Sequence, residues 1–298
     1  ATGLVGLKPT RGRVRGESGV GAVAGLPTGG PLARTVLDAA LLLDAMASGP
    51  VRHTLQAPDS PYMSESGSFV DSAELPLPRL RIGWNTWSPW ATHYDISVDP
   101  QMMEVFEETL ALLESLGHRV EEVQPRPFPD YVDSFRAVWM GLASALPVPD
   151  QVLAGVEPLT AWLVDKGRAQ PPQNLPRALM SLSAFESQLI ADYAPYDVVL
   201  TPGLGQTPRP DGWYSTTDGE LNFVQQCQYT PFTSYLNVAG LPAIALPVGQ
   251  GVSEFGGSTI PIGVQAIGRA GDEATLLRLG LQLEQVLNWQ DRIPPIAR

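Results

Sequence analysis

The 298-residue sequence predicts an α/β fold in which helices cover both faces of a β-sheet. Short, nearly continuous apolar segments are typical of strands that are buried on both faces. The sequence contains DVVLTP (197–202), AIALPV (243–248) and IGVQAI (262–267). Segments with helical periodicity alternate with such strands, and the hydrophobic fraction of 44% is ample for a large core. No linker separates independent units, so we expect one domain over residues 1–298.

The first 78 residues predict a strand, a helix and a surface connection. Apolar residues between glycines in LVGL (4–7) indicate the strand. In the segment 30–46 we expect a helix entered at Gly29-Gly30-Pro31 and left at Gly49-Pro50, because Gly and Pro punctuate helices. Its apolar stripe has helical spacing: Val36, Ala40, Leu43 and Ala47. Residues 52–78 are rich in Ser, Pro and acidic residues and lack periodicity, which indicates a long surface connection.

A strand–helix–strand unit follows. RLRIGW (79–84) and HRVEEV (118–123) predict the two strands. Asp99-Pro100 is typical of a helix start, with an N-cap carboxylate and a proline at the first helical position. Gly117 predicts the helix end, because a glycine adopts the left-handed conformation there without strain. The apolar face of this helix contains Met103, Phe106, Leu110 and Leu113.

The rest of the chain predicts an irregular helical region and then the three apolar strands. The pattern of residues 124–195 is mostly helical, but prolines interrupt it, among them those at 147, 149, 158, 171, 172 and 176. We expect this region to lie on the substrate side and to cover a cleft. The last helix begins near Asp272, and its apolar stripe is Leu276, Leu279, Leu283 and Leu287.

Composition argues against several classes of function. The net charge is −12, whereas a nucleic-acid-binding surface needs a positive face. The longest apolar runs are far shorter than the roughly 18 residues of a membrane span. We therefore expect no nucleic-acid partner and no membrane span, and a cytoplasmic location because no signal peptide is visible. One cysteine, Cys227, allows no internal disulfide, and the three histidines form no HExxH pattern, so we expect no metal site.

Common catalytic motifs are absent from the sequence. GESGVGAVAG (16–25) does not fit the spacing of a dinucleotide fingerprint, and a GxSxG nucleophile elbow does not occur. Cys227 lies in FVQQCQYTPF, which offers no positive charge to lower the pKa of its thiol, so we expect it to be structural. A triad assembled in space from His53, His93 or His118 has no local sequence support. The residues alone thus predict an α/β fold without a convincing catalytic centre.

Several long blocks nevertheless resemble the amidase signature family of serine amide hydrolases. These blocks keep the family's order along nearly the whole chain: GLVGLKPTRGRV (3–14), GPLARTVLDAALLLDAM (30–46), YDVVLTP (196–202), FTSYLNVAGLPAIALPVG (232–249), IPIGVQAIG (260–268) and DEATLLRLGLQLEQ (272–285). The resemblance implies a mixed β-sheet covered by helices, and hydrolysis of a carboxylic amide without metal or cofactor. It also implies a Ser nucleophile, a second Ser held by a cis peptide bond, and a Lys base acting through that Ser.

The resemblance places all three catalytic groups before Ala1. In the family the nucleophile lies in a Gly-Gly-Ser stretch shortly before the segment that matches GLVGLKPTRGRV, and the cis-Ser and Lys lie further upstream. Lys8 matches the loop after the nucleophile, and Lys166 lies in the variable region, so neither is the family's base. We expect no catalytic residue in this chain and expect an upstream segment to supply them.

The resemblance also indicates which residues approach the substrate. By the family pattern these are Thr201, Pro202, Phe232, Thr233 and Asn237, although Phe232 and Asn237 could equally serve to pack and cap the local structure. Tyr235 departs from the small residue or proline usual there, which puts the local pocket shape in doubt. Trp139 and Trp162 have two possible roles: they could line an apolar acyl pocket, or they could simply pack in the core.

Three hypotheses about function follow. The first is the C-terminal part of an amidase whose partners are a small-molecule amide and the upstream segment, with a homodimer unsurprising for the family. The second is a naturally truncated, non-catalytic amidase-like binding protein. The third is an unrelated chemistry through Cys227 or a histidine triad.

Overall fold

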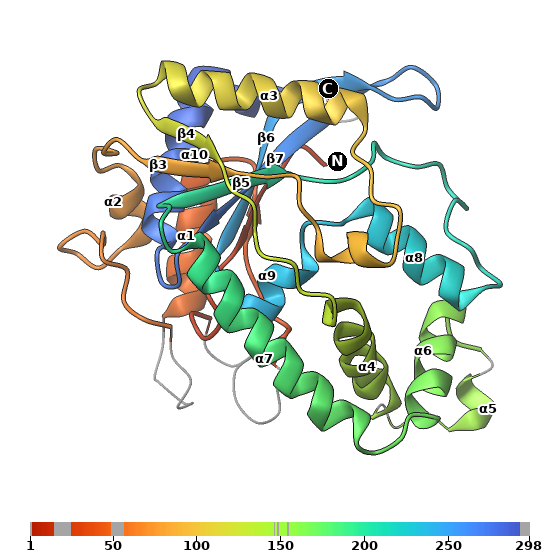
Figure 1. Ribbon diagram of the computed structural model, residues 1–298. Helices are drawn as coiled ribbons and strands as arrows, with labels where there is room; N and C mark the ends of the chain where they lie inside the picture. The colour runs from red at the N-terminus through yellow and green to blue at the C-terminus, as the bar shows by residue number, and fades with distance from the viewer. Residues whose placement is uncertain are drawn as a thin grey trace.

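The computed structural model contains a seven-stranded mixed sheet with helices on both faces (Figure 1). It describes the following residues: 2–14, 25–48, 57–145, 147, 149–153 and 155–292. The strands are β1 (Val5–Lys8), β2 (Leu32–Ala33), β3 (Arg81–Trp84), β4 (Arg119–Glu122), β5 (Val198–Pro202), β6 (Ala243–Val252) and β7 (Thr259–Gly268). The predicted fold class is confirmed.

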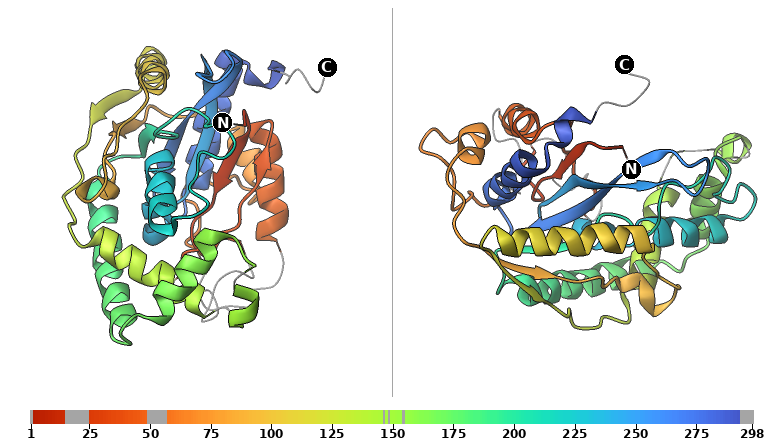
Figure 2. Two further views of the ribbon diagram at one scale, coloured as in Figure 1. Left: turned by 90° about the vertical axis from the view of Figure 1, so that its right-hand side faces the viewer. Right: turned by 90° about the horizontal axis from the view of Figure 1, so that it is seen from above.

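The strand order is β2-β1-β6-β7-β5-β3-β4. The strands from β2 to β5 pair antiparallel, whereas β5, β3 and β4 pair parallel. The carboxyl ends of β5, β3 and β4 therefore lie at one edge of the sheet, where ligands bind in many open α/β sheets. Because β1 pairs with β6, the start of the chain lies beside the β6–β7 hairpin (Figure 2).

Four helices cover one face of the sheet. They are α1 (Val36–Ala47), α2 (Phe69–Ala73), α3 (Pro100–Ser115) and α10 (Glu273–Leu287). Their apolar sides join alternate strand residues such as Val198, Leu200 and Ile244 in one buried core. The alternation of side chains along each strand sends the intervening residues, such as Val199, into the other core.

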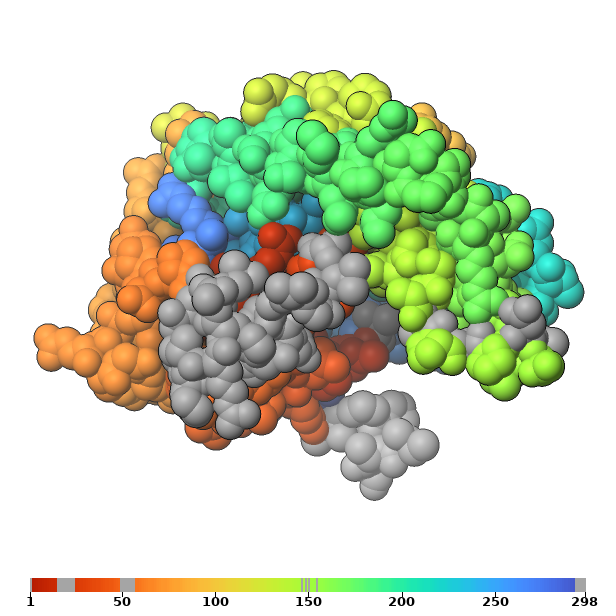
Figure 3. All heavy atoms as spheres, turned by 90° about the horizontal axis from the view of Figure 1, so that it is seen from below, coloured from red at the N-terminus to blue at the C-terminus, as the bar shows by residue number. Residues whose placement is uncertain are grey.

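The other face is covered by a larger set of helices. They are α4 (Tyr131–Ser144), α6 (Pro158–Arg168), α7 (Asn174–Tyr193), α8 (Gly219–Tyr229), α9 (Ser234–Ala239) and the 3₁₀ helix η2 (Pro89–Thr92). The short α5 (Asp150–Leu153) precedes α6, and the 3₁₀ helix η3 (Trp289–Asp291) follows α10. Seen from below, α7 forms a ridge across the molecule (Figure 3), and Met180 on it is 76% exposed. Between α4, α8 and η2 the core is aromatic, with Trp90 packed against Tyr131, Phe135 and Phe223.

Helix ends follow the local sequence closely in three places. The Asp99 side chain accepts a hydrogen bond from Gln101 N, and Gly117 has a φ of +94°, as predicted for the two ends of α3. Asp272 caps α10 by accepting from Thr275 N. Short-range capping chemistry therefore predicted these ends correctly.

Two predicted boundaries are wrong. The first helix begins at Val36, with Thr35 as its N-cap, and not after Pro31, because Leu32–Ala33 pairs with β1 as an edge strand. The surface connection 52–78 contains α2, whose Phe69 and Ser72 are buried against α1 and α10. In both places a tertiary contact overrides a local pattern. Residues 16–24 of the glycine-rich stretch and His53 lie outside the described residues.

Within the described ranges, no helix has both the length and the apolar character needed to cross a bilayer. The same residues contain no group of three or more His, Cys, Asp or Glu side chains that could hold a metal ion.

Candidate functional site

A groove of about 320 Å³ lies beyond the carboxyl end of β5. Four segments form it: the start of the chain into β1, the loop after β5, the end of α8 into α9, and the neighbouring parts of β6 and β7. Its lining residues are Thr2, Gly3, Leu4, Gly6, Leu32, Gly203, Leu204, Tyr229, Thr233, Ala245, Leu246, Pro247, Pro261, Ile262, Gly263, Val264 and Gln265. None of the described residues in this lining is charged, so this part of the groove suits a neutral ligand.

A row of cross-strand neighbours runs through the floor of this groove. Thr201 on β5 pairs with Gln265 on β7, Gln265 with Ala245 on β6, and Ala245 with Gly6 on β1. Residues directly opposite one another in a sheet project from the same face. Ala245 is exposed and leaves open space beside the long side chain of Gln265, whereas Leu32 lies over Gly6.

The Gln265 side chain is held by two hydrogen bonds. Its Nε2 donates to Thr201 Oγ1 at 3.1 Å and to the Phe232 main-chain oxygen at 2.8 Å. Thr201 Oγ1 donates in turn to the Pro202 main-chain oxygen at 3.1 Å. A main-chain oxygen only accepts, so the nitrogen of the Gln265 amide must face Phe232. The amide orientation is therefore fixed by chemistry, and both of its protons are used.

The structure brings four of the five predicted substrate-side residues to this end of the sheet. Thr233 lines the groove. Thr201 and Phe232 are completely buried and hold Gln265, and Pro202 is the buried last residue of β5. Whether any of them approaches a substrate remains a prediction, but their contacts indicate a role through Gln265 for Thr201 and Phe232.

Asn237, the fifth residue, lies toward the opposite end of α9. Its main-chain oxygen accepts from Arg11 Nη2 at 2.8 Å, and the Val238 oxygen accepts from the same atom at 2.6 Å. Arg11 also pairs with Glu186 of α7 at 3.0 Å. These bonds tie α9 and α7 to the loop after β1, and the structure does not bring Asn237 into the groove lining.

The other candidates for nucleophile or base lack a catalytic arrangement. Burial raises the pKa of the Cys227 thiol, which keeps it protonated and unreactive. His118 is fixed between Leu80 N and the Gln282 side chain. His93 Nε2 is 3.8 Å from Asp133, too far for a hydrogen bond, and the carboxylate is 81% exposed.

Lys8, the last residue of β1, has a lowered pKa. Burial and, to a lesser extent, the neighbouring Arg11 lower its pKa to about 7, although Glu273 opposes the shift. Its Nζ donates to the Pro9 main-chain oxygen at 3.0 Å. The described residues offer it no hydroxyl to deprotonate, and it pairs with Ala243 at the end of β1 that lies away from the groove.

The family model for amidases matches residues 1–277. The chain belongs to the amidase family. The putative amidase AmiB2 of Mycobacterium tuberculosis is 32% identical over 302 residues, a match that covers 99% of this chain and 60% of AmiB2. A putative amidase of Synechocystis is 29% identical over 288 residues, covering 95% of this chain and 52% of the relative. This amidase-family chain thus spans about three fifths of the length of AmiB2.

Solved amidase-family structures agree with the fold. A 6-aminohexanoate cyclic dimer hydrolase, complexed with substrate, superposes with a TM-score of 0.83 at 26% identity, covering 99% of this chain and 63% of that one. A bacterial aryl acylamidase of the amidase signature family superposes with a TM-score of 0.71 at 16% identity, covering 96% of this chain and 59% of that one. The second likeness supports the fold alone.

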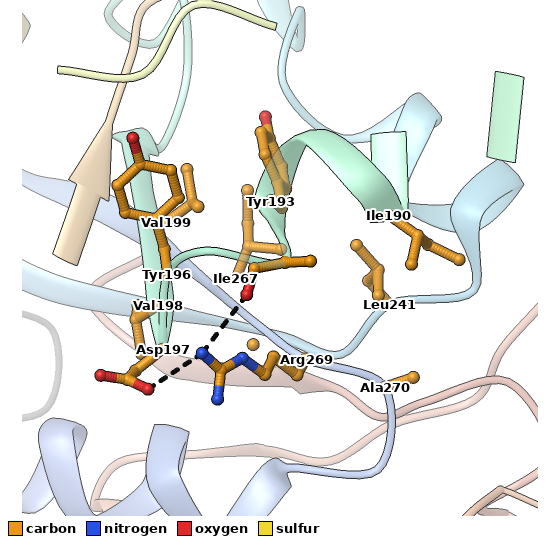
Figure 4. A pocket seen from close by; sticks show the side chains of 12 residues that line it. Ile190, Tyr193, Tyr196, Asp197, Val198, Val199, Leu241, Ile267, Arg269 and Ala270 are labelled. Carbon is orange, nitrogen blue, oxygen red and sulfur yellow. Dashed lines mark hydrogen bonds and ion pairs between the residues drawn. The ribbon is translucent and has the colours of Figure 1, made fainter. Parts of the chain in front are cut away.

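A second cavity of this amidase-family chain lies at the other end of β5 (Figure 4). It has a volume of about 170 Å³ and apolar walls that include Val199, Leu241 and Ile267. The Arg269 guanidinium at its edge lies 3.1 Å from Asp197 and donates to the Ala194 main-chain oxygen at 3.4 Å. The acidic and basic groups of this cavity are therefore bound to each other.

The aromatic residues singled out in the sequence lie away from the groove lining. Trp162 packs against Phe223 of α8 and contacts the Arg136 guanidinium, and Trp139 is 39% exposed. Tyr235 is completely buried in the core of the second face, where its ring meets Trp87 edge-on at 5.7 Å. The helices of residues 124–195 pack with α8 and α9, and their substrate-side role remains a prediction.

Sequence reasoning missed Gln265. It is a polar residue in the middle of the apolar strand IGVQAI, and that interruption was the available signal. A glutamine that is 93% buried must find partners, since a buried amide without hydrogen bonds is costly. Its partners come from two other segments, which the sequence alone does not place beside it.

Proposed function

We propose that this chain forms the substrate-binding part of an amide hydrolase. In the net reaction, water cleaves the carboxylic amide C–N bond, and the products are a carboxylate and an amine. The observation that carries the proposal is the amidase-family match over residues 1–277, together with an uncharged groove beyond the carboxyl end of β5. A neutral amide fits an uncharged groove, because neither partner must give up the solvation of a charge.

We further propose that a segment preceding Ala1 supplies the Ser nucleophile, the cis-Ser and the Lys base. Thr2, Gly3 and Leu4 line the groove, so a preceding segment would reach it directly. The longer relatives have the additional length for such a segment. In this scheme the nucleophile attacks the amide carbon, the amine leaves with a proton, and water then releases the carboxylate.

The cyclic dimer of 6-aminohexanoate is a reasonable first substrate to test. The solved relative with a TM-score of 0.83 is a hydrolase of that compound. Because its two ends are joined, the cyclic dimer carries amide bonds and no charge, like the lining of the groove. Linear anilides and primary amides complete a panel of neutral substrates.

A serine-directed fluorophosphonate probe tests the proposal. The complete natural polypeptide that contains this chain is labelled, digested and mapped, and hydrolysis of the amide panel is followed by mass spectrometry. We expect turnover, and a label on a serine upstream of Ala1. A label on a serine within residues 1–298 would contradict the placement of the nucleophile. Binding of amides without turnover or labelling would favour the alternative, a non-catalytic amidase-like binding protein.

A further inference from the structure

The oxygen of the Gln265 side chain is an acceptor without a donor. Both Nε2 protons are used, by Thr201 Oγ1 at 3.1 Å and by the Phe232 oxygen at 2.8 Å. Oε1 accepts no hydrogen bond from the described residues, and it is not among their buried side-chain atoms that lack a partner, so it is open to the groove. Gln265 is only 7% exposed, so solvent access to this oxygen is limited to the groove that the residue lines. An oriented acceptor that faces a groove and has no protein donor can accept from a ligand that displaces water from it.

The amide cannot reverse its orientation to remove this acceptor. A flip would bring Oε1 against the Phe232 main-chain oxygen, which has no proton to give. Thr201 Oγ1 could donate to a flipped oxygen only by giving up its own bond to Pro202 O. Thr201 and Phe232 therefore hold the Gln265 amide in one orientation. Its Nε2 faces these two partners, and its Oε1 faces the groove.

Space for a ligand exists beside this acceptor. The next residue along the row is Ala245, which is small and exposed, and Gly6 follows it with Leu32 lying over it. The lining around them carries no charge that could compete for a neutral donor. Among the described residues of the lining, Thr2, Tyr229 and Thr233 carry hydroxyl groups, and Thr233 Oγ1 donates to the Thr230 main-chain oxygen at 3.3 Å.

We propose that Gln265 Oε1 accepts a hydrogen bond from the N–H group of the substrate, and that the groove thereby selects primary and secondary amides over tertiary amides and esters. This inference rests on the proposed amide hydrolase function and names its substrate class. Gln265 is a specificity residue in this scheme. An N–H next to the scissile carbonyl is what distinguishes these amides chemically from an ester or an N-methylated amide.

Paired substrates and a Gln265→Met variant test the proposal in the complete natural polypeptide. The substrates are a secondary anilide, its N-methyl analogue and the matching ester, and kcat/KM is measured for each. Methionine keeps a similar volume but has no amide. We expect kcat/KM for the N–H substrate to fall about 10- to 100-fold, the size of one buried hydrogen bond, and to change less than about threefold for the other two.

The ratio between substrates separates recognition from structural damage. A loss of kcat/KM that is equal for all three substrates would mean that Gln265 only supports the sheet, and would overturn the proposal. An unchanged kcat/KM for the N–H substrate would overturn it as well. Gln265→Asn, which keeps an amide but withdraws the acceptor by one methylene, is the second variant if Gln265→Met fails to fold. We expect the same selective loss from it.

Binding distinguishes failure of this inference from failure of the proposed function. If the wild type hydrolyses none of the substrates, the proposed function is wrong, and calorimetry of the uncleaved anilide and its N-methyl analogue takes the place of kinetics. We then expect the wild type to bind the N–H compound about tenfold or more tightly, and the Gln265 variant to lose that preference. Equal binding of the two compounds by the wild type would overturn the inference.

Discussion

The two ends of the central strands differ in how their polar groups are used. Beyond the carboxyl end of β5, the described residues of the groove lining carry no charge, and they offer no donor to the oriented acceptor of Gln265. At the other end, Arg269 binds Asp197, Arg11 binds Glu186, and Lys8 lies beside them with a lowered pKa. We call these the groove end and the charged end.

The comparison teaches that a cavity alone does not indicate a site. The cavity at the charged end has apolar walls, and its two charged residues, Arg269 and Asp197, bind each other (Figure 4). These charges are therefore already paired and offer little to a ligand. At the groove end the protein orients Gln265 Oε1, and the described residues offer this oxygen no donor. A pocket with a few oriented polar groups is the usual form of a small-molecule site.

Matched glycine substitutions at the two ends give the largest expected difference. A Cβ at position 203 would lie 2.6 Å from the Gly263 main-chain oxygen, which is the acceptor of the Gly203 N–H. We expect Gly203→Ala to lower the free energy of unfolding by about 3 kcal/mol, because two hydrogen-bonded main chains must separate. At position 268 the nearest atom would be Leu276 Cγ at 3.1 Å, and a side chain can shift. We expect Gly268→Ala to cost about 1 kcal/mol or less. Urea unfolding of both variants is the measurement; equal losses would contradict the difference in tolerance.

The pH dependence of stability probes the charged end through Lys8. Burial holds the pKa of Lys8 at about 7 in the folded chain, below the 10.5 of a free lysine. Between these two values the unfolded chain binds more protons, so stability rises with pH and levels off above the upper value. We expect the wild-type free energy of unfolding to rise more steeply than that of Lys8→Met between pH 7 and 9.5, by up to about 1.4 kcal/mol per pH unit. Parallel pH profiles of the two proteins would contradict the lowered pKa.

Removing the Thr201 hydroxyl tests whether its hydrogen bond fixes the orientation of the Gln265 amide at the groove end. Thr201→Val leaves one Nε2 proton without its acceptor, and we expect the free energy of unfolding to fall by about 1 kcal/mol. Selectivity for N–H substrates should fall with it, because the amide gains freedom to move. Thr207→Val is the matched control, since Thr207 is equally buried but its hydroxyl has no hydrogen-bond partner among the described residues. We expect Thr207→Val to leave the free energy of unfolding unchanged or slightly higher. An equal loss of unfolding free energy in both variants would argue that the Thr201 hydroxyl does not hold Gln265.

The smallest expected effect is at the ion pair of the charged end. Arg269 is 44% exposed and Asp197 27%, and partly exposed pairs contribute less than about 1 kcal/mol. We expect Arg269→Gln to lower thermal stability slightly at low salt and not at 0.5 M salt, and to leave amide turnover unchanged. A marked loss of turnover would show that the charged end takes part in the reaction.

Much of the fold was predictable from local patterns. The apolar segments that became β5, β6 and β7 were recognised because burial on both faces leaves little place for polar residues. Asp99, Gly117 and Asp272 marked helix ends because capping involves only neighbours within one turn. The short strand β2 and the helix α2 escaped prediction, since each exists through its contact with a distant segment.

The sequence by itself determined the layered α/β class, the helix ends and the resemblance to the amidase signature family. Only the tertiary structure decided which side chains meet at the groove. Thr201, Phe232 and Gln265 come from three separate segments, and sheet pairing together with the α8–α9 turn brings them within hydrogen-bonding distance. A donor and acceptor pattern of this kind depends on register and on which atoms remain unpaired after folding. Those two properties follow from packing across the whole chain.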